Sequence, residues 1–421
     1  MSEFDKIIGY EDIKAELARF ASVLKEPERY SRLGVTLPAG ILLYGEPGLG
    51  KTLMAKCFIA ETGCKVYTLG KEKPNGDFVN QIKETFEAAK KEFDGITIVF
   101  LDDMDKFANE DNMHRDAEEY VAVQSCIDDC KGHGVFAFAT VNDRYCLPDS
   151  LLRAGRFDKV VEVEVPKGKD AESIIRHFLS QKQTMGDIDT EEISRMMEGK
   201  SCAELETVIN EAGIYAGYTG KTEIDQADVV KACMRMMFDS PECINPADDA
   251  NTKSIAVHEA GHAVVAEVLD PGSVTLVSVC RHSGDVEGIT KTHRPDGCDV
   301  SKELQEHIVI GGLGGKAATE MLYGVADVGC NADMHKVFEM VAGFVDDNCT
   351  LGFEAFESGS SSGYLLEKKD RLIATEIERY YQIAKRVIAE NRDFLEAVVD
   401  ALMDHKTITY REMQRIKEKV G

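Results

Sequence analysis

The chain has 421 residues, 43% of them hydrophobic and 29% charged, a composition typical of a globular protein with about two or three domains. Its net charge of −26 argues against nucleic acid as the main partner, because a phosphate-binding surface needs clustered Lys and Arg. No apolar run approaches the roughly 20 residues that span a bilayer, and the 12 cysteines follow no disulfide-like spacing. We therefore expect a cytoplasmic protein with free thiols, no membrane span and no nucleic-acid partner.

The first part of the chain alternates apolar, strand-like runs with polar, helix-like runs. The apolar runs are residues 41–44, 97–101 and 135–139. Such alternation predicts a parallel sheet wrapped by helices, which makes residues 1–166 an α/β domain.

A glycine-rich loop follows the first of these strands and precedes the helical run 53–60. The loop consists of Gly45, Glu46, Pro47, Gly48, Leu49, Gly50, Lys51 and Thr52. In this strand, loop and helix order, backbone N–H groups and the helix N-terminus bind phosphate. Lys51 would reach the β- and γ-phosphates and Thr52 would bind Mg²⁺, so the loop predicts an ATP and Mg²⁺ site.

Polar residues follow the next two strands. Asp102 and Asp103 end the second strand, where Asp102 would hold Mg²⁺ and Asp103 would orient the attacking water. Asn142 follows the third strand and could touch the γ-phosphate or that water. Further on, Arg153 and Arg156 are poorly placed for phosphates of their own chain, so we expect them to act on a neighbouring subunit.

The strands stop after this domain. Residues 167–240 have helical periodicity and predict a small helical lid. The stretch 239–251 contains two prolines and several acids and marks a domain boundary. From 252 to 421 the chain is predicted to be mainly helical, with a small sheet around residues 273–279.

A zinc-peptidase pattern opens this last domain. His258 and His262 are four residues apart, so on a helix they share one face and can bind one Zn²⁺. Glu259 lies beside them as the general base for the attacking water. Two buried structural histidines are the alternative, but they would leave Glu259 as an uncompensated buried acid.

With these motifs, the chain resembles the FtsH family of AAA+ ATP-dependent zinc metalloproteases. The matching segments are residues 45–52 as Walker A, 98–103 as Walker B, Asn142 as sensor 1, Arg153 and Arg156 as arginine fingers, 201–212 in the lid, and 8–9 near adenine. The resemblance implies an AAA+ α/β domain with a helical lid, followed by a mainly helical zinc metalloprotease domain.

The resemblance also implies the third zinc ligand. Asp333 ends the segment 329–333, which is similar to the family segment that completes the site. His335 competes, but two residues along a helix it points to another face. Asp327 has no motif support, and Cys330 lies outside the matching position.

Four features depart from the family pattern. Asp103 replaces a Glu and is shorter by about 1.5 Å, which predicts slow ATP hydrolysis. The aromatic-Val-Gly pore loop is missing in residues 73–78, where Phe78 is the nearest aromatic. Cys202 replaces a Gly in the lid. The family's N-terminal membrane segments are absent, which removes the usual reason to expect membrane-protein substrates.

These features predict an ATP-dependent zinc metalloendopeptidase that unfolds, threads and hydrolyses polypeptides. The predicted cofactors are ATP, Mg²⁺ and Zn²⁺, the predicted partners are polypeptide substrates, and the predicted assembly is a homo-hexamer. An AAA+ remodelling ATPase, or an ATP-gated binding module with an inactive peptidase domain, is the alternative interpretation.

Overall fold

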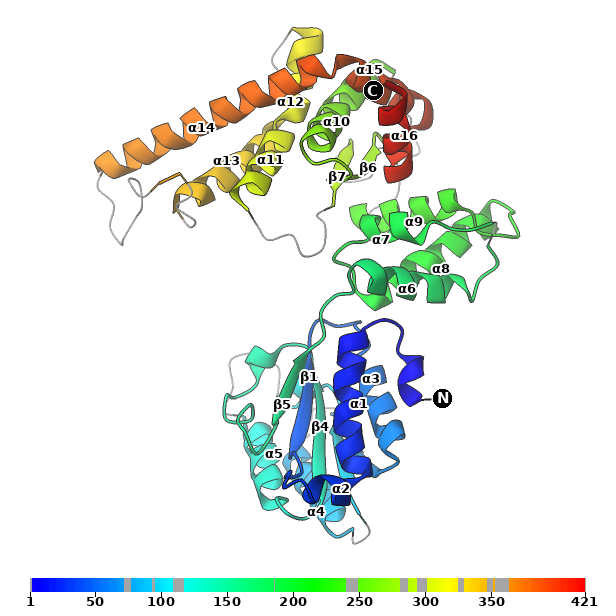
Figure 1. The fold of residues 1–421 in the computed structure, drawn as a ribbon, viewed down its shortest axis with the longest axis vertical. Helices are drawn as coiled ribbons and strands as arrows, with labels where there is room; N and C mark the ends of the chain where they lie inside the picture. The colour runs from blue at the N-terminus through cyan, green and yellow to red at the C-terminus, as the bar shows by residue number, and fades with distance from the viewer. Residues whose placement is uncertain are drawn as a thin grey trace. The chain divides into compact units, whose positions relative to one another are not determined.

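The chain forms two compact units in the computed structural model, which Figure 1 shows as a ribbon. The structure describes residues 2–71, 77–92, 95–108, 117–184, 186–239, 249–280, 287–293, 301–324, 329–346, 351–352 and 363–420. Unit 1 comprises residues 1–186 and 199–224, and unit 2 comprises residues 187–198 and 225–421.

A five-stranded parallel sheet organises unit 1. Its strands are β1 (Gly40–Tyr44), β2 (Lys65–Leu69), β3 (Thr97–Leu101), β4 (Val135–Val141) and β5 (Lys159–Glu162). The strand order is β2-β3-β4-β1-β5, so the carboxyl ends of β3, β4 and β1 lie side by side. In open sheets of this kind, ligands bind at the carboxyl ends of the strands. The order therefore brings together three segments that are far apart in the sequence.

Helices cover both faces of this sheet. As Figure 1 shows, α1 (Glu11–Lys25) and α3 (Lys51–Thr62) lie on one side, and α4 (Phe78–Lys90) and α5 (Glu118–Asp129) lie on the other. Strands β3 and β4 are buried along their whole length, which explains their continuous apolar sequences. Phe58 on α3 packs against Phe138 on β4, with ring centroids 4.9 Å apart.

Six further elements complete unit 1. They are η1 (Glu3–Lys6), α2 (Pro27–Ser31), η2 (Met104–Lys106), η3 (Arg144–Cys146), α6 (Gly168–Leu179) and α8 (Cys202–Tyr218). Helix α8 begins where Ser201 and Glu204 form a capping box, in which each side chain binds the backbone N–H of the other residue. This cap fixes the start of α8 beside the glycine-rich loop, where Ala203 N donates to Gly48 O at 3.1 Å.

Unit 2 is mainly helical and is built around α10 (Asp249–Leu269). The other helices are α11 (Lys302–Gly312), α12 (Gly314–Tyr323), α13 (Asn331–Asp346), α14 (Gly363–Glu390), α15 (Arg392–His405) and α16 (Tyr410–Val420). A small antiparallel sheet has the order β7-β6-β8, with β6 (Val274–Ser278), β7 (Ile289–Thr292) and β8 (Thr407–Thr409). The buried Ala and Val side chains of α10 lie in one core with those of α12 and α15.

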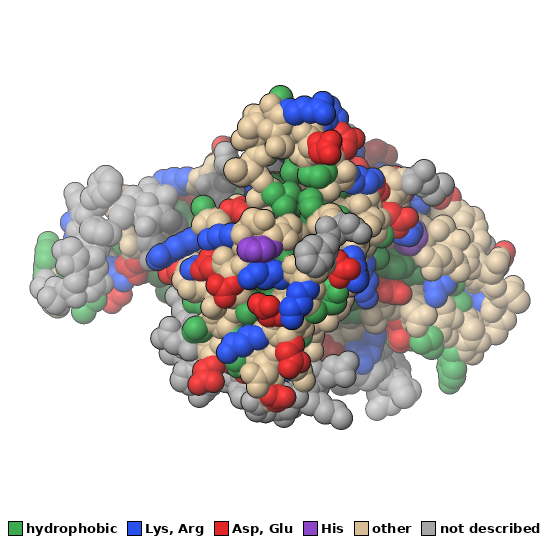
Figure 2. Space-filling model, turned by 90° about the horizontal axis from the view of Figure 1, so that it is seen from below, with side chains coloured by type: hydrophobic (Ala, Val, Ile, Leu, Met, Phe, Trp, Pro, Cys, Tyr) green, Lys and Arg blue, Asp and Glu red, His purple; other side chains and the backbone are tan. Residues whose placement is uncertain are grey.

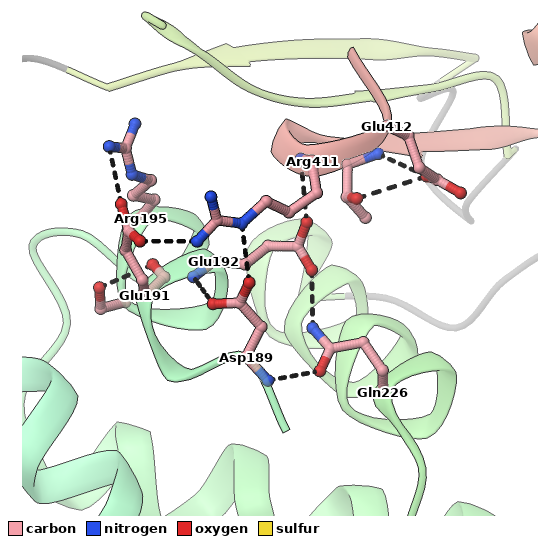
Figure 3. A network of polar contacts seen from close by, with 9 residues as sticks. Asp189, Glu191, Glu192, Arg195, Gln226, Arg411 and Glu412 are labelled. Atoms are coloured by element: carbon pink, nitrogen blue, oxygen red, sulfur yellow. Dashed lines mark hydrogen bonds and ion pairs between the residues drawn. The ribbon is translucent and has the colours of Figure 1, made fainter. Parts of the chain in front are cut away.

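Two helices of the predicted lid region belong to unit 2. These are α7 (Thr190–Met196) and α9 (Gln226–Phe238). Figure 3 shows Arg411 of α16 reaching α7, where it binds Asp189 at 2.9 Å and Glu191 at 2.8 Å. Glu192, only 3% exposed, accepts a hydrogen bond from Gln226 on α9 at 2.7 Å. The predicted lid thus contributes elements to both units, and the three-part division of the chain stays a prediction.

The fold class predicted from the sequence is confirmed: a parallel α/β sheet comes first and a mainly helical domain follows. The strands expected at 41–44, 97–101 and 135–139 and the small sheet near residue 276 are present. Most of the expected boundary, residues 240–248, lies outside the described residues. On the face that Figure 2 shows, Lys and Arg side chains are interspersed with Asp and Glu side chains. Within the described part of the chain, no helix has the length and apolar content needed to cross a bilayer.

Candidate functional site

The predicted nucleotide-site residues meet at the carboxyl edge of the parallel sheet. Lys51, at the start of α3, donates from Nζ to Gly45 O at 2.7 Å, to Glu46 O at 2.7 Å and to Asn142 Oδ1 at 3.0 Å. Burial lowers the pKa of Lys51 from its ordinary value, against the raising effect of Asp105 and then of Asp103. Its three N–H groups are thus satisfied, and bound phosphate oxygens can replace these acceptors.

Asp102 ends β3 next to Thr52. Its Oδ1 accepts hydrogen bonds from Thr52 Oγ1 at 3.0 Å and from Thr140 Oγ1 at 2.8 Å. A carboxylate beside a threonine hydroxyl is the oxygen pair that binds Mg²⁺ in phosphate-binding loops. The donor set therefore fits Mg²⁺, with Thr52 and Asp102 as the residues that would hold it.

The next two acids differ in what they contact. Asp103 lies in the left-handed region at φ 49°, and its carboxylate pairs with Lys106 at 2.6 Å in a largely exposed ion pair. Asp105 instead accepts a hydrogen bond from Asn142 Nδ2 at 2.8 Å. The sequence analysis assigned a role to Asp103 and none to Asp105, although Asp105 is only the fourth residue after the strand.

The two arginines also differ. Arg153 is exposed and has no partner among the described side chains. Arg156 is partly buried and binds Asp128 of its own chain, with Nη2 at 2.8 Å from Oδ2, and also donates to Ser150 O. Arg153 is therefore exposed without an ion pair to the described residues, whereas Arg156 would have to leave Asp128 before it could bind another group.

The predicted adenine and lid segments adjoin the loop. Tyr10, which follows Gly9, donates from its hydroxyl to Glu164 O at 3.0 Å and lies 3.4 Å from Cys202 Sγ. Cys202 Sγ in turn lies 3.9 Å from Leu49 O. The cysteine that replaces the family's glycine thus packs between Tyr10 and the phosphate-binding loop.

Phe78 does not serve as an exposed pore aromatic. It is 2% exposed and packs edge-on against Phe107, with ring centroids 4.9 Å apart. The side chain is therefore part of the core of unit 1. The preceding residues 72–76 lie outside the described residues.

In unit 2, three predicted zinc ligands converge. His258 Nε2 and His262 Nε2 lie 3.1 and 3.3 Å from Asp333 Oδ2, and 3.1 Å from each other. In a tetrahedral zinc site with bonds of about 2.0–2.1 Å, ligand atoms lie about 3.3 Å apart. These residues therefore fit Zn²⁺ in both spacing and chemistry. Within the described part of the chain, they form the one group of such side chains that could hold a metal ion.

The surroundings orient these ligands. His262 Nδ1 lies 2.8 Å from Gly311 O, so a proton on Nδ1 leaves the Nε2 lone pair directed at the cluster. Burial by itself would raise the pKa of Asp333, but in the metal-free site hydrogen bonds with His258 and His262 hold that pKa well below its usual range. Zn²⁺ would take the place of the protons in these hydrogen bonds. The carboxylate is therefore ionised, as a zinc ligand must be.

Close backbone packing allows this convergence. A Cβ added at Gly261 of α10 would lie 2.4 Å from Gly314 O, so α12 can approach only because neither position has a side chain. At Gly315, an added Cβ would lie 2.5 Å from His262 Nε2 and 2.7 Å from His258 Cε1. Position 315 must therefore be glycine if both histidines are to face Asp333.

Glu259 lies beside the ligands and is 9% exposed. The hydroxyl of Thr290, on strand β7, lies 2.7 Å from Glu259 Oε2 and donates to it. This contact holds one carboxylate oxygen in place and leaves the other to accept a proton from water. No sequence motif pointed to Thr290, because it lies 31 residues from Glu259 and β7 is short.

The competing zinc ligands are not part of this group. His335 is exposed on α13, as its spacing from Asp333 predicted. Cys330 is buried but is not one of the three converging residues. Asp327 lies outside the described residues.

The fold and the two sites define a class of protein in which an AAA-type ATPase unit and a zinc peptidase unit share one chain. Residues 41–165 match the profile of the ATPase family associated with various cellular activities (AAA), and residues 246–416 match that of peptidase family M41. Together, these two matches and the relatives described below support an FtsH-family AAA+ zinc metalloprotease. It is thus an enzyme, and the two domains imply ATP, Mg²⁺ and Zn²⁺ as cofactors.

Its relatives are named ATP-dependent zinc metalloproteases. The chain is 28% identical to FtsH 1 of Bdellovibrio bacteriovorus over 98% of its own length and 68% of the relative. It is 28% identical to FtsH of Streptococcus pneumoniae, over 99% of this chain and 67% of the relative. It is 29% identical to the chloroplastic FTSH 2 of Oryza sativa, over 98% of this chain and 65% of the relative. The similarity therefore runs through both units, and the chain spans about two thirds of the length of these relatives.

Proposed function

We propose that the chain uses ATP hydrolysis in unit 1 to unfold and thread polypeptides, which unit 2 cleaves. The observation that carries this proposal is the convergence of His258, His262 and Asp333, with Glu259 beside them, in a chain with a phosphate-binding loop. When bound there, Zn²⁺ would supply a Lewis acid that polarises the scissile carbonyl. Glu259 takes a proton from the attacking water and delivers it to the leaving amine.

In unit 1, Lys51 exchanges its backbone acceptors for phosphate oxygens. Thr52 and Asp102 would hold Mg²⁺, and Asp103 orients the attacking water after it separates from Lys106. Because the Asp103–Lys106 pair is largely exposed, breaking it costs little. The short reach of Asp103 accounts for the slow hydrolysis that we expect.

The exposed position of Arg153 supports assembly as a homo-hexamer. An arginine that has no partner among the described residues of its own chain can stabilise the charge that develops at a neighbour's nucleotide. Turnover per chain should then rise with protein concentration. The cytoplasmic location expected from the sequence stays a prediction.

Degradation of an unfolded casein-type substrate tests the proposal, with ATP, with a non-hydrolysable analogue and with a zinc chelator. We expect cleavage only with hydrolysable ATP and without chelator. Glu259→Gln should abolish cleavage and retain both zinc and ATPase activity, whereas Glu303→Gln, at an exposed position on α11, should leave all three unchanged. A wild-type chain that binds zinc and hydrolyses ATP but cuts no substrate would instead be a remodelling ATPase. Tight ATP binding without turnover would indicate the ATP-gated binding module.

A further inference from the structure

The side-chain amide of Asn142 is bound at both ends. Its Nδ2 donates to Asp105 Oδ2 at 2.8 Å, and its Oδ1 accepts from Lys51 Nζ at 3.0 Å. A carboxylate only accepts hydrogen bonds and an ammonium group only donates them. With Asp105 on one side and Lys51 on the other, only one of the two amide orientations satisfies both neighbours.

Asp105 itself is held by the core. It lies in the short turn η2 between Met104 and Phe107, which are both 0% exposed, and Tyr120 Oη donates to Asp105 O at 3.3 Å. The turn therefore cannot easily rotate the carboxylate away from Asn142. Asp103, one residue before the turn, has its carboxylate in the largely exposed pair with Lys106.

One carboxylate oxygen of Asp105 lacks a hydrogen bond to the described residues, which lowers the stability of the fold. Its Oδ1 is buried and finds no hydrogen-bond partner among the described residues. A buried carboxylate oxygen without a partner destabilises a fold, so the fold alone does not favour an acid here. The nearby charge of Lys51 offsets part of this cost, because Lys51 is buried and interacts favourably with Asp105.

We propose that Asp105 is a positioning residue of the ATPase site, which fixes the amide of Asn142 with Oδ1 toward Lys51 and one N–H free for the nucleotide. The proposal rests on ATP hydrolysis at this site, as proposed above. When phosphate draws Lys51 away, the bond to Asp105 still holds the orientation of the amide. Asp105 therefore acts on turnover through Asn142 and has little effect on ATP affinity.

Substitution of Asp105 tests this role. In Asp105→Asn, the new amide can either donate or accept, so it no longer selects one orientation of Asn142. The kcat of ATP hydrolysis should then fall about tenfold, while the Kd of an ATP analogue changes less than about threefold. Asp143→Asn removes the same charge from the residue next to Asn142, but Asp143 is exposed and its carboxylate accepts hydrogen bonds from Tyr145 N and Cys146 Sγ. Its turnover should stay within about twofold of wild type.

A double-mutant cycle separates positioning from a general structural effect. If Asp105 acts through Asn142, Asp105→Ala should cost little more once Asn142→Ala is present. Independent, multiplying losses would overturn the proposal, as would wild-type kcat in Asp105→Asn. Thermal unfolding of each variant checks that the fold is retained.

A second measurement does not depend on turnover. The Nδ2 protons of Asn142 give an NMR amide pair that Asn142→Ala identifies by its loss. The proton bound to Asp105 should lie downfield in the wild type and shift upfield in Asp105→Ala. An unchanged signal would overturn the positioning role of Asp105, even if the chain did not hydrolyse ATP. Absence of ATPase activity in the wild type would by itself overturn only the proposed function.

Discussion

The nucleotide site and the zinc site differ in how their polar groups are satisfied before any ligand binds. In unit 1, Lys51 already has three oxygen acceptors, and Asp102 accepts from two hydroxyl groups. In unit 2, two imidazole nitrogens and a carboxylate oxygen face one another at 3.1–3.3 Å, close to the spacing of zinc ligands. The first site exchanges its partners when a ligand binds. The second gathers three side chains that can ligate one cation.

The sites also differ in how the chain builds them. The nucleotide site collects residues from the ends of three neighbouring parallel strands. The zinc site takes two ligands from one helix and the third from α13, across a close contact between α10 and α12. Metal loss should therefore change unit 2 far more than unit 1.

The largest effect is expected for His258→Ala. The change removes one of three ligands, so stoichiometric zinc, about one per chain in the wild type, should be lost together with proteolysis. ATPase activity should be largely retained, because the nucleotide site shares no residue with the zinc site. Metal analysis and the two activity assays on one preparation test this. Stoichiometric zinc after replacement of both histidines would contradict the ligand assignment.

Arg153→Ala should lower ATP turnover by about a thousandfold, as expected for an arginine that acts across subunits. When this variant is mixed with wild-type subunits, each variant subunit should also inactivate a neighbour. The ATPase activity of the mixture should therefore fall more steeply than the wild-type fraction. Zinc content should not change. Full activity of a dilute wild-type monomer would refute action across subunits.

Gly315→Ala should lower zinc affinity by about ten- to a hundredfold, because its Cβ would displace both histidine rings from Asp333. Gly311→Ala is the matched control, since a Cβ there would meet only Ala266 at an ordinary 3.9 Å. A chelator competition titration compares the two variants. Equal zinc affinities would mean that Gly315 does not hold the ligand geometry.

Thr290→Val should lower the kcat of peptide cleavage about tenfold and leave both KM and zinc content unchanged. The substitution keeps the shape of the side chain but removes the hydroxyl that donates to Glu259 at 2.7 Å. Thr290→Ser should restore activity. Thr292→Val, at an exposed position on the same strand, should have no effect. A wild-type kcat in Thr290→Val would assign Thr290 to packing alone.

The smallest effect is expected for Asp103→Glu, which should raise ATP turnover by about three- to tenfold because the longer side chain reaches the attacking water. Asp103→Asn should eliminate turnover. Steady-state kinetics at saturating ATP measure both variants. Unchanged turnover in Asp103→Asn would mean that another residue orients the water.

Much of this protein was predictable because its main motifs are local. A phosphate-binding loop needs one strand, one loop and one helix, and His258 and His262 share a helix face through their spacing alone. The buried strands β3 and β4 were predicted because strands covered on both faces are apolar throughout. The edge strands β2 and β5 were missed because their exposed positions carry polar residues such as Lys65 and Glu162.

The α/β and helical classes, the phosphate-binding loop and the pair of histidines follow from the amino-acid sequence, since residues close in the chain have a geometry set by the local backbone. Three contacts instead depend on the tertiary structure: Asp333 with His258, 75 residues away, Asp105 rather than Asp103 with Asn142, and Thr290 with Glu259. It also placed Phe78 in the core and Arg156 against Asp128. These outcomes depend on strand order and helix packing, which bring distant residues together and leave no periodic trace in the sequence.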